Sequence, residues 1–317
     1  MIEVSRLTKS YGEKVAVNDL SFTIRPGVVT GFLGPNGAGK STTMRMIVGL
    51  DAPTSGTAMV NGRLYPEHQA PLHEVGALLE TRAVHTSRSA YHHLLALAAT
   101  HGIGKARVGE VIELVGLQDV ADKRAGGFSL GMGQRLGIAS ALLGDPATVV
   151  LDEPVNGLDP EGVRWVRDLL RGLAAEGRTV FVSSHLMSEM ALTAEHLIVI
   201  GRGRLLADTS VAEFIAANSS AAVLVRSPRA AELQGALEQP DVTISSTSSD
   251  TLEVTGLTAA QIGEAALRAG IALHELSPVQ GSLEQAFMTM TEDSIEYHAR
   301  TPVDAAQTGR PEHQDAA

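Results

Sequence analysis

A short glycine-rich segment has the residue types that hold phosphate groups. It consists of Gly34, Pro35, Asn36, Gly37, Ala38, Gly39, Lys40 and Ser41, followed by Thr42. Glycines let the backbone curl so that successive N–H groups point at phosphate oxygens. A lysine at this position reaches the β- and γ-phosphates, and the serine hydroxyl can ligate Mg²⁺. The segment therefore predicts a binding site for a nucleotide and Mg²⁺.

The flanking residues predict the strand and the helix that must position this phosphate loop. Residues 28–33 are apolar, as in a buried strand, and residues 42–50 read as a helix with Met46, Ile47 and Leu50 on one side. The N-terminus of that helix adds partial positive charge beside a bound phosphate. A glycine-rich turn without a ligand is the alternative, but the strand–loop–helix order favours nucleotide binding.

Two acids follow a second apolar strand, residues 149–151. Asp152 and Glu153 stand at its end. A carboxylate beside a phosphate loop can hold Mg²⁺ through water, and a second one can polarise the attacking water. Strands often end in a solvated acid, so these residues alone say little. Together with the phosphate loop they predict hydrolysis of the bound nucleotide.

Four further positions accompany these acids. Ser129 and Gly131 open an apolar helix about twenty residues before Asp152, where a helix N-terminus favours phosphate. An ordinary helix cap is the competing interpretation of Ser129. Asp159 follows the two acids, and His185 follows the next apolar strand, residues 179–182. A single histidine at a strand end is usually only a polar residue, so the context decides its interpretation.

Taken in order, these motifs resemble the nucleotide-binding domain of ATP-binding-cassette (ABC) proteins over roughly residues 1–215. Tyr11, the phosphate loop (Walker A), the signature segment at 128–135, the two acids (Walker B), Asp159 and the switch residue His185 carry the resemblance. The details are most similar to the ATP-binding subunits of type-2 ABC exporters, including the daunorubicin- and bacitracin-resistance kinds. Leu130 and Met132, which depart from the usual Ser-Gly-Gly-Gln, are features of that branch.

The resemblance implies a fold and a role for each residue. The expected fold is an α/β phosphate-loop cassette with an inserted helical subdomain, and two such chains would sandwich two ATP molecules head to tail. For the nucleotide and its metal ion, the resemblance implies that Tyr11 stacks on adenine (or is simply a turn tyrosine), that Gly34 through Thr42 bind phosphate and Mg²⁺, and that Ser41 and Asp152 support Mg²⁺. For hydrolysis, it implies that Glu153 orients or deprotonates water and that His185 contacts the γ-phosphate. Across the dimer, Ser129 and Gly131 would contact the γ-phosphate bound to the other chain, and Asp159 would lie at the dimer seam.

One position departs from the family pattern. The family usually has a glutamine after the strand that leads into the helical subdomain, whereas here residues 75–79 are followed by Glu80. A carboxylate oxygen can ligate Mg²⁺ as an amide oxygen can. We therefore expect Glu80 to substitute as a metal ligand. The next residues, including Arg82, His85 and Arg88, are where a membrane partner would dock, although they also suit a solvated loop.

The chain divides into three parts by sequence pattern. We expect an ABC ATP-binding domain over residues 1–218, with its helical subdomain at about 85–145. Residues 221–290 have the order strand–helix–strand–strand–helix–strand, which predicts a small α+β, ferredoxin-like accessory domain with a structural or regulatory role. Residues 291–317 are polar and acidic, and we expect a disordered tail.

Composition restricts the class of protein further. The net charge of −11 and an aromatic content of 3% argue against a nucleic-acid surface, and the absence of cysteine excludes thiolate chemistry. No apolar stretch approaches the ~20 residues that span a bilayer. Within these limits, the resemblance to ABC exporters implies an ATPase that acts as a homodimer on the cytoplasmic face of the membrane and drives a separate integral-membrane permease. Its cargo would be drugs, antibiotics or other hydrophobic solutes.

Three alternatives remain open from the sequence. A soluble ABC ATPase acting on ribosomes or nucleic acid is disfavoured by the single cassette and the acidic charge. An importer subunit is disfavoured because such subunits carry mostly β-barrel C-terminal domains. A switch that binds ATP without hydrolysing it is disfavoured by Glu153 and His185. The transported solute is not encoded here, because in this family the permease selects it.

Overall fold

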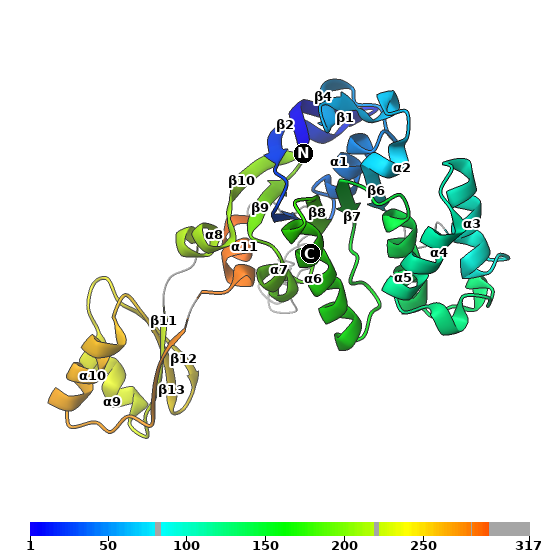
Figure 1. Ribbon diagram of the computed structural model, residues 1–317. Coiled ribbons are helices and arrows are strands. Elements are labelled where there is room, and N and C mark those ends of the chain that lie inside the picture. Colours follow the sequence, from blue (N-terminus) through cyan, green and yellow to red (C-terminus); the bar gives the residue numbers. More distant parts are fainter. Residues whose placement is uncertain (80–83, 219–221, 280, 292–317) are drawn as a thin grey trace, which may run out of the picture.

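The computed structural model describes residues 1–79, 84–218, 222–279 and 281–291, which form three β-sheets and their helices (Figure 1). Within these residues no helix is both long enough and apolar enough to cross a bilayer.

The central sheet has six strands in the order β10-β9-β3-β8-β7-β6. They are β3 (Val29–Leu33), β6 (Val75–Leu78), β7 (Thr148–Leu151), β8 (Thr179–Ser183), β9 (His196–Gly201) and β10 (Arg204–Ser210). All neighbouring pairs are parallel except β9 and β10. Every residue of β3, β7 and β8 is buried, as expected for parallel strands covered on both faces. The carboxyl ends of these three strands therefore meet at one edge of the sheet.

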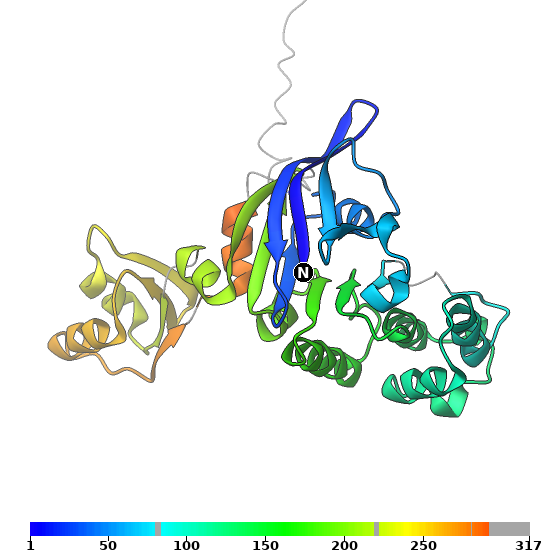
Figure 2. The same cartoon turned by 45° about the horizontal axis from the view of Figure 1, so that its top comes forward.

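A second, antiparallel sheet covers the helix that follows the phosphate loop. Its strands are β1 (Ile2–Tyr11), β2 (Lys14–Ile24), β4 (Ser55–Val60) and β5 (Arg63–Leu64), in the order β2-β1-β4-β5 (Figure 2). Helix α1 (Lys40–Ile47) buries Met44 and Ile47 in the core between the two sheets. The rings of Phe22, Phe32 and Phe181 join the sheets, with centroids 4.9–6.2 Å apart. A short turn of helix, α2 (Pro71–Glu74), leads into β6.

Helices gather at one end of the central sheet, on the side away from the sheet formed within residues 222–279 (Figures 1 and 2). They are α3 (Ala90–Thr100), α4 (Lys105–Leu114) and α5 (Leu130–Leu142). This is the helical region expected at 85–145. Helices α6 (Pro160–Ala175) and α7 (Met187–Thr193) follow strands β7 and β8 and share a core with the helical region. The α/β fold with inserted helices that the sequence predicted is thus present.

The third sheet has its own hydrophobic core. Strands β11 (Ala222–Arg226), β12 (Thr243–Ser248), β13 (Thr251–Thr255) and β14 (Glu275–Val279) pair antiparallel in the order β12-β13-β11-β14. Helices α9 (Ala230–Leu237) and α10 (Ala259–Arg268) pack Leu233 and Ile262 against Val225 and Val254. This order of elements supports the ferredoxin-like assignment, which stays a proposal.

The last helix differs from the expectation. Helix α11 (Leu283–Thr291) packs on α8 (Val211–Asn218) and α7, and its buried Leu283 and Ala286 belong to the core of the central sheet. The predicted range 221–290 therefore includes a helix that returns to the first domain, because its apolar face finds a partner there. The expected tail begins within α11 at Thr291, and residues 292–317 lie outside the described part of the chain.

Candidate nucleotide site

The phosphate loop connects β3 to α1, as the sequence predicted. Gly39 caps α1 with a φ of 103°, a conformation that side chains rarely adopt. A Cβ atom there would also lie 2.5 Å from the carbonyl oxygen of Ala16. Both the backbone conformation and the close approach therefore require glycine at this position.

An open hollow of about 430 Å³ lies over this loop. Residues predicted to bind the nucleotide line it together with both acids; the lining is Tyr11, Lys14, Ala16, Asn36 through Thr42, Asp152 and Glu153. Tyr11 has 51% of its surface exposed, and its hydroxyl lies 3.1 Å from Asp51 Oδ2. An exposed ring at the rim of the hollow is available to stack on a flat base.

Lys40 points into the curl of the loop. Its Nζ donates to the carbonyl oxygens of Gly34 at 2.6 Å and of Pro35 at 3.3 Å. Burial lowers the pKa of Lys40, and the nearby carboxylates of Glu153 and Asp152 oppose that shift. These carbonyls hold the ammonium where phosphate oxygens of a nucleotide can take their place.

Of the expected Mg²⁺ ligands, Ser41 and Asp152 lie within the described residues, and their side chains face each other. Ser41 Oγ donates to Asp152 Oδ2 at 2.7 Å, and Ser183 at the end of β8 donates to the other carboxylate oxygen. Mg²⁺ binds hard oxygen ligands and usually takes only one or two protein ligands beside the nucleotide phosphates. A hydroxyl and a carboxylate at the mouth of a phosphate loop fit that pattern.

Glu153 and His185, the predicted catalytic pair, are in direct contact. Oε2 of Glu153 lies 2.7 Å from Nδ1 of His185 and accepts a hydrogen bond from the His185 backbone N–H at 3.2 Å. Glu153 has a φ of +52°, which is uncommon for a residue with a side chain. Such strained residues cluster at functional sites, where the surroundings hold them in place.

Ser129 and Asp159 lie at two helix N-termini that touch. Ser129 Oγ accepts from the N–H of Met132 at 3.2 Å, and Asp159 Oδ1 accepts from the N–H of Gly162 at 2.8 Å. The glycines at 131 and 157 allow the two segments to approach closely. None of these residues lines the hollow over the phosphate loop of the same chain. The cap interpretation of Ser129 therefore holds within one chain, and phosphate contact would require a second chain.

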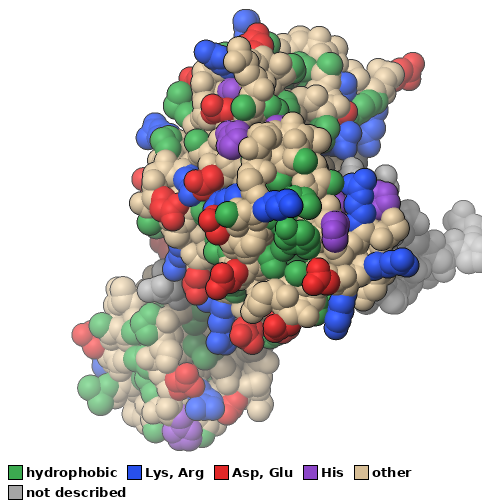
Figure 3. All heavy atoms as spheres, turned by 45° about the vertical axis from the view of Figure 1, so that its right-hand side comes forward, with side chains coloured by type: hydrophobic (Ala, Val, Ile, Leu, Met, Phe, Trp, Pro, Cys, Tyr) green, Lys and Arg blue, Asp and Glu red, His purple; other side chains and the backbone are tan. Residues whose placement is uncertain are grey.

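Glu80 and Arg82 lie outside the described residues, so their predicted roles stay predictions. The neighbouring surface has an apolar hollow lined by Leu50, Leu79, Val84, Leu97 and His93, among others. Figure 3 views the molecule from this side, where hydrophobic side chains lie between basic and histidine side chains. His85 Nδ1 lies 3.0 Å from Ser87 Oγ, a contact within its own loop.

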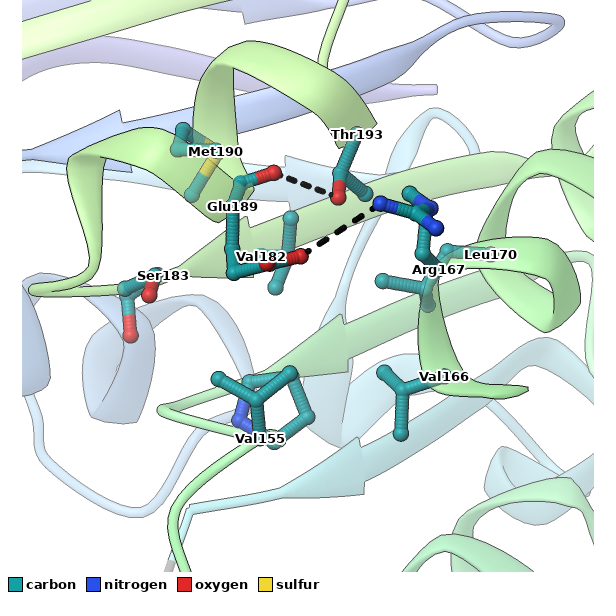
Figure 4. Close-up of a pocket in the computed structure, with 11 residues that line it drawn as sticks. Val155, Val166, Arg167, Leu170, Val182, Ser183, Glu189, Met190 and Thr193 are labelled. Atoms are coloured by element: carbon teal, nitrogen blue, oxygen red, sulfur yellow. Dashed lines mark hydrogen bonds and ion pairs between the residues drawn. The ribbon is translucent and has the colours of Figure 1, made fainter. Parts of the chain in front are cut away.

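A small cavity lies behind the switch histidine, between α6 and α7 (Figure 4). Arg167 of α6 extends toward Glu189 of α7, with Nη1 3.6 Å from Oε2. That oxygen is buried and accepts no hydrogen bond from the residues that the structure describes. The ion pair joins the helix that begins after Asp159 to the helix that follows His185.

Sequence reasoning missed two residues at the site. Ser183 donates to Asp152 and accepts from the N–H of Glu153 at 3.0 Å, and Gln134 on α5 donates to the carbonyl oxygen of Glu153. The sequence indicated Ser183 only weakly, as a serine at the end of an apolar strand. Gln134 was indicated as a polar residue on the same helical face as apolar Ile138 and Ala141.

Comparison with known proteins places these observations in a family. A family model described as ABC transporter matches residues 17–156, and a domain of unknown function (DUF8746) matches residues 221–284. The chain is 38% identical over 300 residues to the uncharacterized ABC transporter ATP-binding protein YhcH of Bacillus subtilis (strain 168), covering 93% of this chain and 97% of that protein. It is 43% identical over 209 residues to the bacitracin transport ATP-binding protein BcrA of Bacillus licheniformis, covering 65% and 68% of the two chains.

A solved structure extends the likeness to the fold. The dimeric structure of MJ0796, a bacterial ABC transporter cassette, superposes with a TM-score of 0.61 at 25% identity, covering 66% of this chain and 98% of that one. The α/β cassette predicted from the sequence is thereby confirmed.

Proposed function

The chain belongs to the family of ABC transporter ATP-binding proteins, and from this premise we propose that it hydrolyses ATP to drive a separate membrane permease. The observation that carries the proposal is the grouping of Lys40, Ser41, Asp152 and the Glu153–His185 pair at one edge of the central sheet. These groups follow β3, β7 and β8, whose carboxyl ends meet at one edge of the sheet. All of them except His185, which contacts Glu153, line the hollow.

Each of these groups has a distinct task in phosphoryl transfer to water. Lys40 would exchange its carbonyl partners for the β- and γ-phosphates, while Ser41 and Asp152 would hold Mg²⁺. The ion, when bound, neutralises charge that develops on the phosphates. The Glu153 carboxylate would orient the attacking water or accept its proton, and His185 would hold that carboxylate and the γ-phosphate in line.

A second copy of the chain would complete the site. In one chain Ser129, Gly131 and Asp159 stand away from the hollow, whereas a head-to-tail dimer would place a signature segment over each γ-phosphate. The dimeric relative of known structure supports this arrangement. ATP would favour the closed dimer, and loss of the γ-phosphate would release it, so that an attached permease at the cytoplasmic membrane face undergoes a cycle of movement.

The cargo and the direction of transport are proposed from the relatives. The relative named for bacitracin transport favours export of antibiotics or similar hydrophobic solutes. In the same cycle Glu80 would take the place of the family's glutamine beside Mg²⁺. The sheet of residues 222–279, which bears none of the groups at the nucleotide site, would serve a structural or regulatory role.

Affinity purification of the Glu153→Gln chain from detergent-solubilised cells with ATP and Mg²⁺ tests the proposal. This variant should keep ATP and retain the closed complex, so a polytopic membrane protein should co-purify at stoichiometric level. The matched control is Glu153→Gln combined with Lys40→Ala, which should not hold ATP and should not trap that complex. Ribosomal or DNA-associated proteins in place of a membrane partner would assign the chain to the soluble ABC ATPases.

A further inference from the structure

Gln134 is the one polar side chain on the buried face of α5, among the residues that the structure describes. It is fully buried, with 0% of its surface exposed, while Leu136, Ile138, Ala139 and Leu142 bury apolar groups around it. Burial of an amide costs free energy unless its polar atoms are paired. An apolar residue of similar size would pack here without that cost.

Among the described residues the amide makes one hydrogen bond, and its acceptor belongs to the residue that carries the catalytic carboxylate. Gln134 Nε2 donates to the backbone carbonyl oxygen of Glu153 at 3.0 Å. The other amide atom, Oε1, is buried and has no hydrogen-bond partner among the described residues. Within the part of the chain that the structure describes, Glu153 is therefore the one residue that anchors this amide.

The backbone of Glu153 is held from several sides. Its carbonyl oxygen accepts from Gln134 and, at 3.2 Å, from the N–H of Asn156, while its N–H donates to Ser183 Oγ at 3.0 Å. These contacts fix a residue whose φ of +52° would otherwise be costly. A different backbone angle would swing the carboxylate away from His185.

We propose that Gln134 is a positioning residue that ties the signature helix to the catalytic carboxylate of the same chain. This inference rests on the proposed function. Helix α5 begins one residue after Ser129, which would contact the nucleotide of the opposite site in a dimer. Gln134 lies about one and a half turns further along the same helix. When ATP binds at one site and shifts α5, the position of the Glu153 carboxylate at the other site thus changes. The two sites therefore hydrolyse ATP cooperatively.

The test compares two substitutions that remove a buried polar group in the full-length chain. Gln134→Met keeps the volume but loses the donor. The control Thr179→Val removes a buried hydroxyl that has no hydrogen-bond partner among the described residues and lies at the start of β8, away from Ser183. For Gln134→Met we expect kcat for ATP to fall about tenfold or more, as for a displaced catalytic group. KM for ATP should stay within about twofold, and the Hill coefficient should fall toward one. Thr179→Val should retain wild-type kinetics.

A third variant separates positioning from simple packing. Gln134→Glu keeps the shape, and burial raises the pKa of such a carboxyl. Below that pKa the protonated acid can donate to the Glu153 carbonyl, and above it the carboxylate repels that oxygen. The activity of Gln134→Glu relative to wild type should therefore rise as the pH falls, while the same ratio for Gln134→Met should stay flat.

The outcomes are distinguishable. Wild-type kcat and Hill coefficient in Gln134→Met would overturn the inference and leave the proposed function intact, provided that thermal unfolding shows every variant to be folded. Equal losses of kcat in Gln134→Met and Thr179→Val would also overturn it, because the effect would then be one of packing. Absence of ATP hydrolysis by the wild-type chain, alone and with its permease, would instead remove the proposed function itself.

Discussion

The carboxylate of Glu153 lies 2.7 Å from the ring of His185, and each residue stands two positions beyond the end of its strand, β7 and β8, which are parallel neighbours. The backbone N–H of His185 donates to the same carboxylate oxygen, so both the ring and the backbone of His185 hold the Glu153 carboxylate in place. Water that attacks a γ-phosphate in the hollow would therefore meet an acceptor whose position depends on the switch residue.

Glu153→Gln should bind ATP but hydrolyse it poorly. The amide keeps the size of the side chain and loses the capacity to accept a proton, a change that costs about 10²–10⁴-fold in general base catalysis. Steady-state hydrolysis checks the rate, and size-exclusion chromatography with ATP and Mg²⁺ should show a persistent dimer. Undiminished turnover would mean that another group positions the water.

Lys40→Ala should abolish tight ATP binding. The ammonium group is already enclosed by the carbonyls of Gly34 and Pro35, and charged hydrogen bonds contribute about 1.5–3 kcal/mol each. Titration with a fluorescent ATP analogue measures the affinity. Wild-type affinity in this variant would disprove the assignment of the phosphate loop.

The lowered pKa of Lys40 adds a pH-dependent signature to the same binding step. Between that lowered pKa and the ordinary value of 10.5, the buried amine of the free protein is partly neutral. Phosphate oxygens favour the charged form, so ATP binding should take up a proton in this pH window. Calorimetry in two buffers of different ionisation enthalpy measures the uptake, which should disappear in Lys40→Arg because a guanidinium stays charged.

Glu80→Gln should alter the Mg²⁺ dependence of hydrolysis or its coupling to transport. A carboxylate adds negative charge to an acidic site, so the amide should change the Mg²⁺ concentration that gives half-maximal activity. The checks are a Mg²⁺ titration of the hydrolysis rate and transport with the permease present. Identical profiles in both would exclude Glu80 from the site.

Much of the site could be predicted because its residues stand next to strong local signals. Lys40, Asp152 and His185 each follow an apolar strand, and parallel strands necessarily bring their ends to one edge. Gln134 could not be found this way, because its role depends on a contact with Glu153 across 19 residues of sequence. The docking of α11 on the first domain was missed for a similar reason: its amphipathic pattern does not say which core it joins.

The ion pair behind the switch should stabilise the contact between α6 and α7. Arg167→Met leaves Glu189 Oε2 buried without its partner, which costs about 1–3 kcal/mol in the free energy of unfolding. Adding Glu189→Gln should recover part of the loss because the unpaired charge is gone. Denaturant unfolding measures both, with the exposed Arg164→Met on the same helix as the control. Additive effects of the two substitutions would show that the pair is not energetically coupled.

Helix α11 should contribute to the stability of the first domain although it follows the accessory sheet in sequence. Leu283 is 2% exposed and packs in the core of the central sheet, whereas Met288 on the same helix is 63% exposed. Truncation of a buried leucine costs about 2–5 kcal/mol, so Leu283→Ala should lower the midpoint of the cassette's unfolding transition. Met288→Ala should change it little, within about 0.5 kcal/mol.

Because ATP binds only the folded cassette, its presence should raise the midpoint of that same transition, which identifies the unit that Leu283 stabilises. Loss of stability confined to a transition that ATP does not shift would place α11 with the accessory sheet instead.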